Sequence, residues 1–140
     1  PASSVSNIDV LVNLLMGWGL DFIVLTGGNP AGRKIHNELK KNICFNDEML
    51  ADKYLINTGK FAYIEDLFST LDFKKYILHQ RIGIPESNSE YLKENNLSRT
   101  IMASNFMNVV QDKHLSFKNF DEETKENFRW LFQKIGQILK

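Results

Sequence analysis

The stretch from Ile8 to Leu25, IDVLVNLLMGWGLDFIVL, decides how the rest of the chain can fold. Its bulky apolar residues recur at steps of three and four, which is the spacing of one helix face. They are Leu11, Leu14, Leu15, Trp18, Phe22 and Leu25. Burying a large apolar side chain contributes roughly 1.5–3 kcal/mol. We therefore expect a helix over residues 8–25 whose wide apolar face is covered by other helices.

Two glycines, Gly17 and Gly19, interrupt this stretch. A glycine inside a helix costs roughly 1 kcal/mol relative to alanine, so a helix that keeps both is expected to have a neighbour packed close to its backbone. The alternative is that the chain breaks at these glycines and that Asp21–Thr26 is a buried strand entering a Gly-Gly turn. Short apolar runs cannot be assigned by pattern alone. The longer repeat of the stretch favours the helix.

Length and charge limit the classes to which the protein can belong. At 140 residues the chain is expected to form one domain, residues 1–140. Its 17 basic and 17 acidic residues cancel, so contact with a polyanion has to come from a local patch. The single cysteine, Cys44, can form neither an internal disulfide nor a structural zinc site. No uncharged apolar run reaches the roughly 18–20 residues that a membrane span needs.

Other parts of the chain also show helical spacing. Apolar residues repeat in this way in residues 61–77, 97–114 and 121–140, whereas residues 81–96 are rich in glycine, proline, serine and asparagine and are expected to form a loop. Gly27-Gly28-Asn29-Pro30 is expected to stop the first helix. The sequence predicts an all-α fold of five or six helices, without a pair of alternating strands.

The most basic stretch is residues 32–42, which contains Arg33, Lys34, Lys40 and Lys41 against one acid, Glu38. On composition alone, a solvated helix face accounts for this cluster. The alternative is a surface that binds a polyanion such as RNA. A second and smaller group, which could join the first, contains Lys74, Lys75, His79 and Arg81.

Catalytic motifs are not found in the sequence. None of the three histidines has a second metal-ligating residue at helical spacing, and the glycine-rich phosphate-binding signatures are absent. Thr26-Gly27-Gly28 could open a phosphate-binding turn if the preceding residues formed a strand, although Pro30 removes one backbone donor from it. Cys44 is expected to be a core residue and not a nucleophile.

Three separate stretches, taken in order, follow a pattern known from one enzyme family. Leu14–Leu20 (LLMGWGL) is similar to its signature helix, and Met102–Val110 (MASNFMNVV) to a second helix that carries carboxylates. Ile56–Ile64 (INTGKFAYI), followed by Leu71–Leu78 (LDFKKYIL), is similar to the stretch that runs from a Val-Asn to a Tyr-Ile pair. Most of the chain thus resembles the endonuclease domain of the ribonuclease III family, and the resemblance implies a ribonuclease III-like helical bundle.

The four acidic positions of that family are substituted in this chain. Enzymes of the family cut double-stranded RNA with Mg²⁺ held by four carboxylates, because hard divalent ions need oxygen ligands. Leu14, Trp18, Ser104 and Met107 stand at the corresponding positions. The resemblance therefore implies a protein without nuclease activity that holds no metal and no other cofactor.

Inactive domains of this kind occur in mitochondria, as structural proteins of the large ribosomal subunit and as subunits of RNA-processing complexes. By this resemblance we expect a non-catalytic component of the mitochondrial large ribosomal subunit, located in the matrix. It would contact ribosomal RNA or other structured RNA and would pair with itself or with a related ribonuclease III-like subunit as a homo- or heterodimer.

The expected contact residues follow from the same resemblance. Because the family dimerises through its signature helix, the expected dimer interface contains Leu15, Trp18 and Phe22. The expected RNA-binding residues are Arg33, Lys34, Lys40, Lys41, Lys74 and Lys75. Two functions from other classes stay open: a helical protein–protein adaptor without an RNA role, and an enzyme on an α/β scaffold that uses the Gly27-Gly28 turn.

Overall fold

A computed structural model describes residues 5–43, 54–80, 83 and 86–139. The chain divides into two compact units, of which the first contains Pro1–Ala62 and Leu131–Lys140 and the second contains Tyr63–Trp130. The chain therefore passes from one unit to the other twice, after Ala62 and after Trp130. The assignment of residues 1–140 to one domain stays a prediction.

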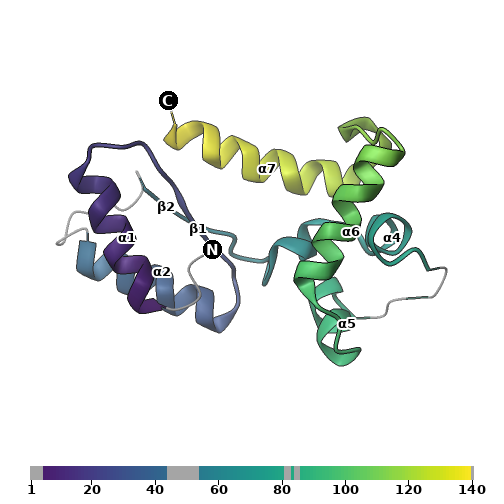
Figure 1. The fold of residues 1–140 in the computed structure, drawn as a ribbon, viewed down its shortest axis with the longest axis horizontal. Helices are drawn as coiled ribbons and strands as arrows, with labels where there is room; N and C mark the ends of the chain where they lie inside the picture. Colours follow the sequence, from purple (N-terminus) through teal and green to yellow (C-terminus); the bar gives the residue numbers. More distant parts are fainter. Residues whose placement is uncertain (1–4, 44–53, 81–82, 84–85, 140) are drawn as a thin grey trace. The chain divides into compact units, whose positions relative to one another are not determined.

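The described residues of the first unit form two complete helices, two short strands and the end of a third helix, α7 (Glu122–Ile138) (Figure 1). In chain order the complete elements are α1 (Val5–Gly17), β1 (Val24–Thr26), α2 (Pro30–Ile43) and β2 (Leu55–Asn57). The strands pair in parallel, with Val24 opposite Leu55 and Thr26 opposite Asn57. Most described residues are helical, as predicted, but the prediction of an all-α fold is wrong for this sheet.

The predicted helix over residues 8–25 is wrong beyond Gly17. The alternative, a buried strand over Asp21–Thr26, is confirmed only in part, because the strand is limited to Val24–Thr26 and Leu25 is exposed. Gly19 has a φ of 67°, a left-handed conformation that ends helices. Its N–H donates to the Met16 carbonyl at 3.0 Å, and the next N–H, of Leu20, donates to the Leu15 carbonyl at 3.1 Å. This double hydrogen bond closes the last turn of α1, so Gly19 acts as a terminator and not as a helix residue.

The core of the first unit uses a different side of α1 from the predicted one. Val12, Leu39 and Leu55 form the buried cluster, and Ile8 and Met16 pack against it. Residues 8, 12 and 16 lie one helical turn apart, and this face is the one turned toward α2 and the sheet. Four apolar residues along α1 and directly after it are instead exposed, namely Val10, Leu11, Leu14 and Trp18.

The second unit contains short helical segments and two longer helices (Figure 1). In chain order these are the 3₁₀-helix η1 (Ile64–Leu67), α4 (Thr70–Asp72), the π-helix η2 (Phe73–Leu78), α5 (Asn88–Glu94), α6 (Arg99–Asp112), the 3₁₀-helix η3 (Phe117–Asn119) and the start of α7 (Glu122–Ile138). The helices predicted in residues 97–114 and 121–140 are confirmed, whereas α5 lies where a loop was expected.

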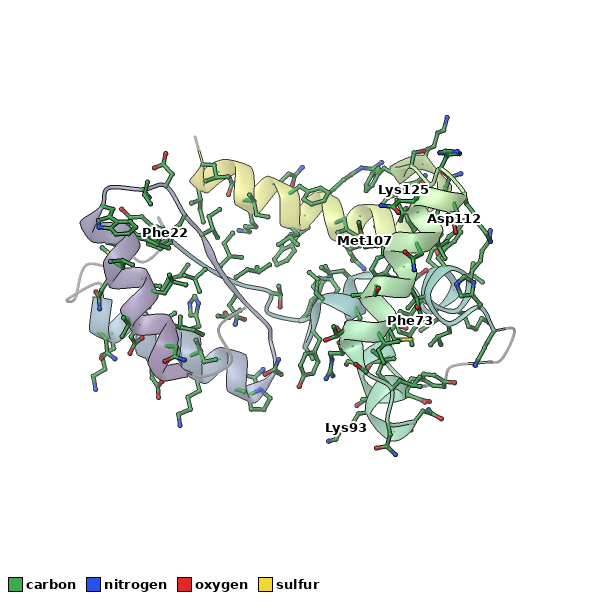
Figure 2. The ribbon with its side chains drawn as sticks, viewed as in Figure 1. Phe22, Phe73, Lys93, Met107, Asp112 and Lys125 are labelled. Carbon is green, nitrogen blue, oxygen red and sulfur yellow. The ribbon has the colours of Figure 1, made fainter. Side chains whose placement is uncertain are left out.

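An aromatic core holds the second unit together. Phe73, Ile77 and Leu92 form its buried centre, and Met102 and Phe106 of α6 pack against them. Figure 2 labels Phe73. Phe68 lies at the middle of three edge-to-face ring contacts, with centroid distances of 5.2 Å to Phe106, 5.9 Å to Phe120 and 5.0 Å to Phe128. Such contacts are the preferred geometry of aromatic pairs.

A buried polar network joins α4 to the start of α7. Ser69 and Asp121 share a short hydrogen bond, and Thr124 donates to a carboxylate oxygen of Asp72 at 2.7 Å. Asp72 also accepts the backbone N–H of Asp121 at 2.8 Å, and Asp121 accepts that of Thr124 at 3.0 Å. Each side chain in the network has a partner, so the network is satisfied and structural.

Candidate functional site

The carboxyl ends of β1 and β2 lie side by side and continue into two loops that are bonded together. The Thr58 N–H donates to the Thr26 carbonyl at 2.9 Å, which extends the sheet by one step. The side-chain amide of Asn57 donates to the hydroxyl oxygen of Thr26 and to the carbonyl of Gly27, both at 2.9 Å. The Gly28 N–H donates to the Phe61 carbonyl at 2.8 Å. This edge of a parallel sheet is where open α/β folds bind ligands.

Glycine is required in this turn because the two loops touch. A Cβ atom on Gly27 would overlap the carbonyl oxygen of Ala62, and one on Gly28 would overlap that of Gly59. A Cβ on Gly32, in the first turn of α2, would overlap the Gly27 carbonyl. The glycines therefore serve close backbone packing, which is a structural use of this residue.

The start of α2 is capped from within the chain. The Asn29 side chain accepts the Gly32 N–H at 2.9 Å and donates to the Ala62 carbonyl at 2.6 Å. Asparagine is among the preferred capping residues, and Pro30 is suited to the first helical position. The N–H groups of Gly28 and Gly32, which a phosphate would need, are thus already used inside the protein. The turn therefore joins two loops of the protein. This use of its N–H groups disfavours the alternative of an enzyme that uses the Gly27-Gly28 turn.

The predicted basic cluster forms one face of α2. Arg33, Lys34 and Lys41 line a shallow depression of about 460 Å³ on this helix, together with Pro30, Asn37 and Glu38. Lys34 and Glu38 are an exposed pair with a nitrogen–oxygen distance of 3.9 Å. Exposed pairs of this kind contribute little, about 0–1 kcal/mol. Lys40, by contrast, is half-buried and does not line the depression.

The second predicted basic group lies in the other unit. Lys74 and Lys75 belong to η2 and line a depression of about 440 Å³ with Leu71, His79 and Gln80. The Lys75 ammonium also lies 4.9 Å from the centre of the Tyr76 ring, within the range of a cation–π contact. The two predicted basic groups therefore line different depressions, one in each unit.

The four positions that the resemblance aligns with metal-binding carboxylates lie in different units, two in each. Leu14 lies on α1 and Trp18 follows its last residue, and both are exposed. Ser104 and Met107 lie on exposed positions of α6 (Figure 2 labels Met107). Among the described residues, no group of three or more histidine, cysteine, aspartate or glutamate side chains is placed to hold a metal ion.

The three predicted interface residues differ in their surroundings. Trp18 is 67% exposed, the highest fraction among the aromatic residues of the described chain, and Leu15 is half-buried. Phe22 stacks on Tyr54 with a centroid distance of 4.7 Å and packs against the core of the first unit (Figure 2). Of the three, Trp18 is therefore the residue most accessible to a partner.

Cys44 lies outside the described residues, so its predicted place in the core stays a prediction. In the described part of the chain, no helix combines the length and the apolar character that crossing a membrane requires. Comparisons with protein-family models, with curated proteins and with solved structures found no match for this chain.

Proposed function

We propose that the chain is a non-catalytic RNA-associated protein that contacts phosphates through the basic face of α2. The observation that supports this most directly is the depression in which Arg33, Lys34 and Lys41 converge. The only acid in this helix, Glu38, lies in a weak exposed pair with Lys34 and leaves most of the positive charge unbalanced. With a formal net charge of zero, the chain would attract RNA through this local surface and not through its overall field.

Arg33 is the residue of this face that is best prepared to bind a phosphate. One of its guanidinium nitrogens donates to the Gly28 carbonyl, which anchors the side chain to the turn that joins the two loops. A guanidinium has five N–H donors, so donors remain for a phosphate. Double-stranded RNA is recognised mainly through phosphates and 2′-hydroxyls, for which a few local cations are sufficient.

Binding of RNA to this face can be tested by charge reversal. A Lys34→Glu/Lys41→Glu variant should lose at least about tenfold in affinity for a 20-base-pair RNA duplex at low salt, and its log–log salt slope should become less steep by about 2. Lys93→Glu/Lys118→Glu changes the net charge equally at exposed positions of the second unit and should have a clearly smaller effect. Equal losses in both variants, or an affinity that salt does not change, would refute the proposal.

The absence of catalysis follows from the resemblance, in which Leu14, Trp18, Ser104 and Met107 replace the metal-binding carboxylates. It is tested by incubating a long RNA duplex with the protein in Mg²⁺ and in Mn²⁺. We expect the duplex to stay intact. Cleavage by the wild type that is lost on Ser104→Ala would overturn this part of the proposal. The assignment to the mitochondrial large ribosomal subunit depends on the resemblance alone and stays a prediction.

The exposed apolar face of α1 supports a protein partner for this RNA-associated chain. Val10, Leu14 and Trp18 lie four residues apart along one side, with Leu11 beside them, and all four are exposed. Exposed apolar residues grouped in this way are typical of protein interfaces. We infer that this face binds a second copy of the chain or a related subunit. Sedimentation of the wild type as a dimer, and of Leu14→Gln/Trp18→Gln as a monomer, would support the inference. A monomeric wild type at all concentrations would exclude self-pairing.

The same face favours the second candidate function, a protein–protein adaptor without an RNA role. Reversing the charges of Arg33, Lys34, Lys40 and Lys41 discriminates the two candidates. An adaptor should keep its assembly and its partner after this change, whereas an RNA-associated protein should lose RNA. If the wild type binds no duplex at low salt but still assembles, the adaptor is the better account.

A further inference from the structure

The second unit contains an apolar cavity that neither RNA binding nor subunit pairing uses. It has a volume of about 470 Å³ and lies among η1, η2, α5 and α6. Its walls are formed mostly by aromatic and aliphatic side chains, including Phe68, Phe73, Ile77, Leu92, Met102 and Phe106. Cavities of roughly 300–1,000 Å³ with such walls are typical of sites for small molecules.

One wall of this cavity comes from an uncommon backbone structure. Phe73 and Ile77 belong to the π-helix η2, which ends at His79 in a left-handed conformation with a φ of 53°. The Gln80 N–H donates to the Lys74 carbonyl six residues earlier, at 3.2 Å, so the wide turn continues to the end of the segment. π-Helices are rare and occur frequently at functional sites. The wide turn is therefore a second observation, independent of the volume, that distinguishes this cavity from an ordinary packing gap.

The charge at the edge of the cavity is already balanced. The Arg99 Nε donates to a carboxylate oxygen of Glu65 at 2.5 Å, and its guanidinium lies 3.9 Å from the centre of the Tyr63 ring. Glu65 and Arg99 both line the cavity, and Glu65 is buried. An anion would meet the Glu65 carboxylate and a cation would meet the Arg99 guanidinium, so a charged ligand would have to displace one partner of a formed pair. An uncharged ligand meets no such cost.

The volume indicates the size of the ligand. A protein cavity of about 150 Å³ is sufficient for benzene. The volume found here is several times larger, which is more than one inserted aromatic side chain would fill and enough for a molecule with two or three rings. Apolar walls with a few polar groups at one edge fit a molecule that is mostly apolar and has one hydrogen-bonding group, for which Thr100 at the cavity wall is a partner.

We propose that this cavity binds a small, uncharged and mainly apolar ring molecule. The probe for the test is N-phenyl-1-naphthylamine, which is uncharged, has three rings and fluoresces more strongly in apolar surroundings. The 140-residue wild type should give a saturable increase in fluorescence with one site per chain. Naphthalene should displace the probe, whereas naphthoate and naphthylmethylammonium at the same concentration should displace it at least tenfold less effectively.

A cavity-filling variant locates the probe. Ala103 lines the cavity from an exposed position of α6, so Ala103→Phe should occupy part of the space and obstruct a molecule of two or three rings, with little effect on folding. Its affinity for the probe should fall at least tenfold. Asn105→Phe adds the same ring to the same helix at an exposed position that does not line the cavity, and its affinity should match the wild type. Circular dichroism should be equal in all three proteins.

A second variant keeps the test valid if Ala103→Phe does not fold. Thr100→Phe, at an exposed position in the first turn of α6, should weaken the probe in the same way. The proposal is overturned if the wild type does not bind the probe, if both filling variants bind it normally, or if Asn105→Phe weakens it equally. It is also overturned if Leu14→Gln/Trp18→Gln abolishes binding, because the probe then lies on the apolar face of α1.

Discussion

The contact between the two loops of the first unit makes Gly28→Ala a sharp test of the structure. The Cβ of the new alanine would overlap the carbonyl oxygen of Gly59, which belongs to the backbone and cannot rotate away. One of the loops must therefore move. Such a movement breaks or stretches two hydrogen bonds, from the Gly28 N–H to the Phe61 carbonyl at 2.8 Å and from the Asn57 amide to the Gly27 carbonyl at 2.9 Å.

The expected cost follows from these contacts. A hydrogen bond contributes about 0.5–1.5 kcal/mol, and more when its loss leaves a buried group without a partner. Two such bonds and the displaced backbone give a decrease in the free energy of unfolding of about 3 kcal/mol. For a chain of this length, that decrease corresponds to a fall in Tm of roughly 10 °C.

Urea unfolding followed by far-ultraviolet circular dichroism measures this difference. Gly17→Ala is the matched control, because it makes the same change in the same unit at a helical position with no other atom within 4 Å of the new Cβ. The control should be as stable as the wild type or up to about 1 kcal/mol more stable. If Gly28→Ala unfolds at the same urea concentration as Gly17→Ala, the loops do not pack as described. The phosphate-binding alternative for the turn would then be open again.

Three further predictions concern α2 and α7. Gly136→Ala, inside α7 with open space around the new Cβ, should raise the free energy of unfolding by about 0.5–1 kcal/mol in urea titrations, and a loss would mean that a neighbour packs on this position. Leu39→Ala removes a side chain with no exposed surface and should lower the free energy of unfolding by about 2–5 kcal/mol in the same assay. A decrease below about 1 kcal/mol would show that this face of α2 is not in the core. Burial raises the pKa of Asp121, but hydrogen bonds from Ser69 and Thr124 outweigh it and hold the pKa below its ordinary value. Because the folded pKa is the lower one, the carboxylate stabilises the fold above about pH 4 and this contribution disappears as the pH falls through the folded pKa. Asp121→Asn should therefore be less stable than the wild type at pH 6. Unfolding curves at decreasing pH should show that the difference in stability between the two proteins shrinks below about pH 4. A difference in stability that stays constant would contradict the lowered pKa of Asp121.

The long helices could be predicted because their pattern is long enough to be unambiguous. Residues 97–114 and 121–140 each repeat the apolar spacing over several turns, and α6 and α7 occupy most of them. The strands could not be predicted in this way, since β1 and β2 have three residues each and cannot show alternation. Their pairing joins residues about 30 positions apart, and no local pattern contains that information.

Two errors had local signals that point to the correct structure. Gly19, read as a tolerated helix residue, stands where a left-handed terminator closes α1. In the region expected to be a loop, Ser87 and Glu90 form a capping box at the start of α5, and serine followed three residues later by glutamate is the sequence signature of that motif. The first signal was outweighed by the apolar repeat of residues 8–25 and the second by composition, and neither of these marks where an element begins or ends.

The basic residues of α2 could be predicted from the sequence, but the sequence did not show which of them share one depression. Helical spacing places residues 33, 34 and 41 on one side, and the structure brings these three into one depression and leaves Lys40 out of it. Lys74 and Lys75, which could have joined this group, line a different depression, in the second unit. Charge counts therefore predicted the residues, and only the fold assigns them to particular surfaces.

The two parts of the proposed function depend on different observations and can fail separately. Pairing through α1 was expected from a signature helix that continues past Trp18, whereas α1 ends at Gly17, so a partner would meet a shorter apolar face than the resemblance implies. The proposed RNA binding would use α2, whose exposure and charge do not depend on the length of α1. If Lys34→Glu/Lys41→Glu abolishes RNA binding in a protein that sediments as a monomer, the RNA role stands without the ribonuclease III resemblance. The function would then be determined by the basic face of α2, a helix whose start is held in place by the contact between the two loops.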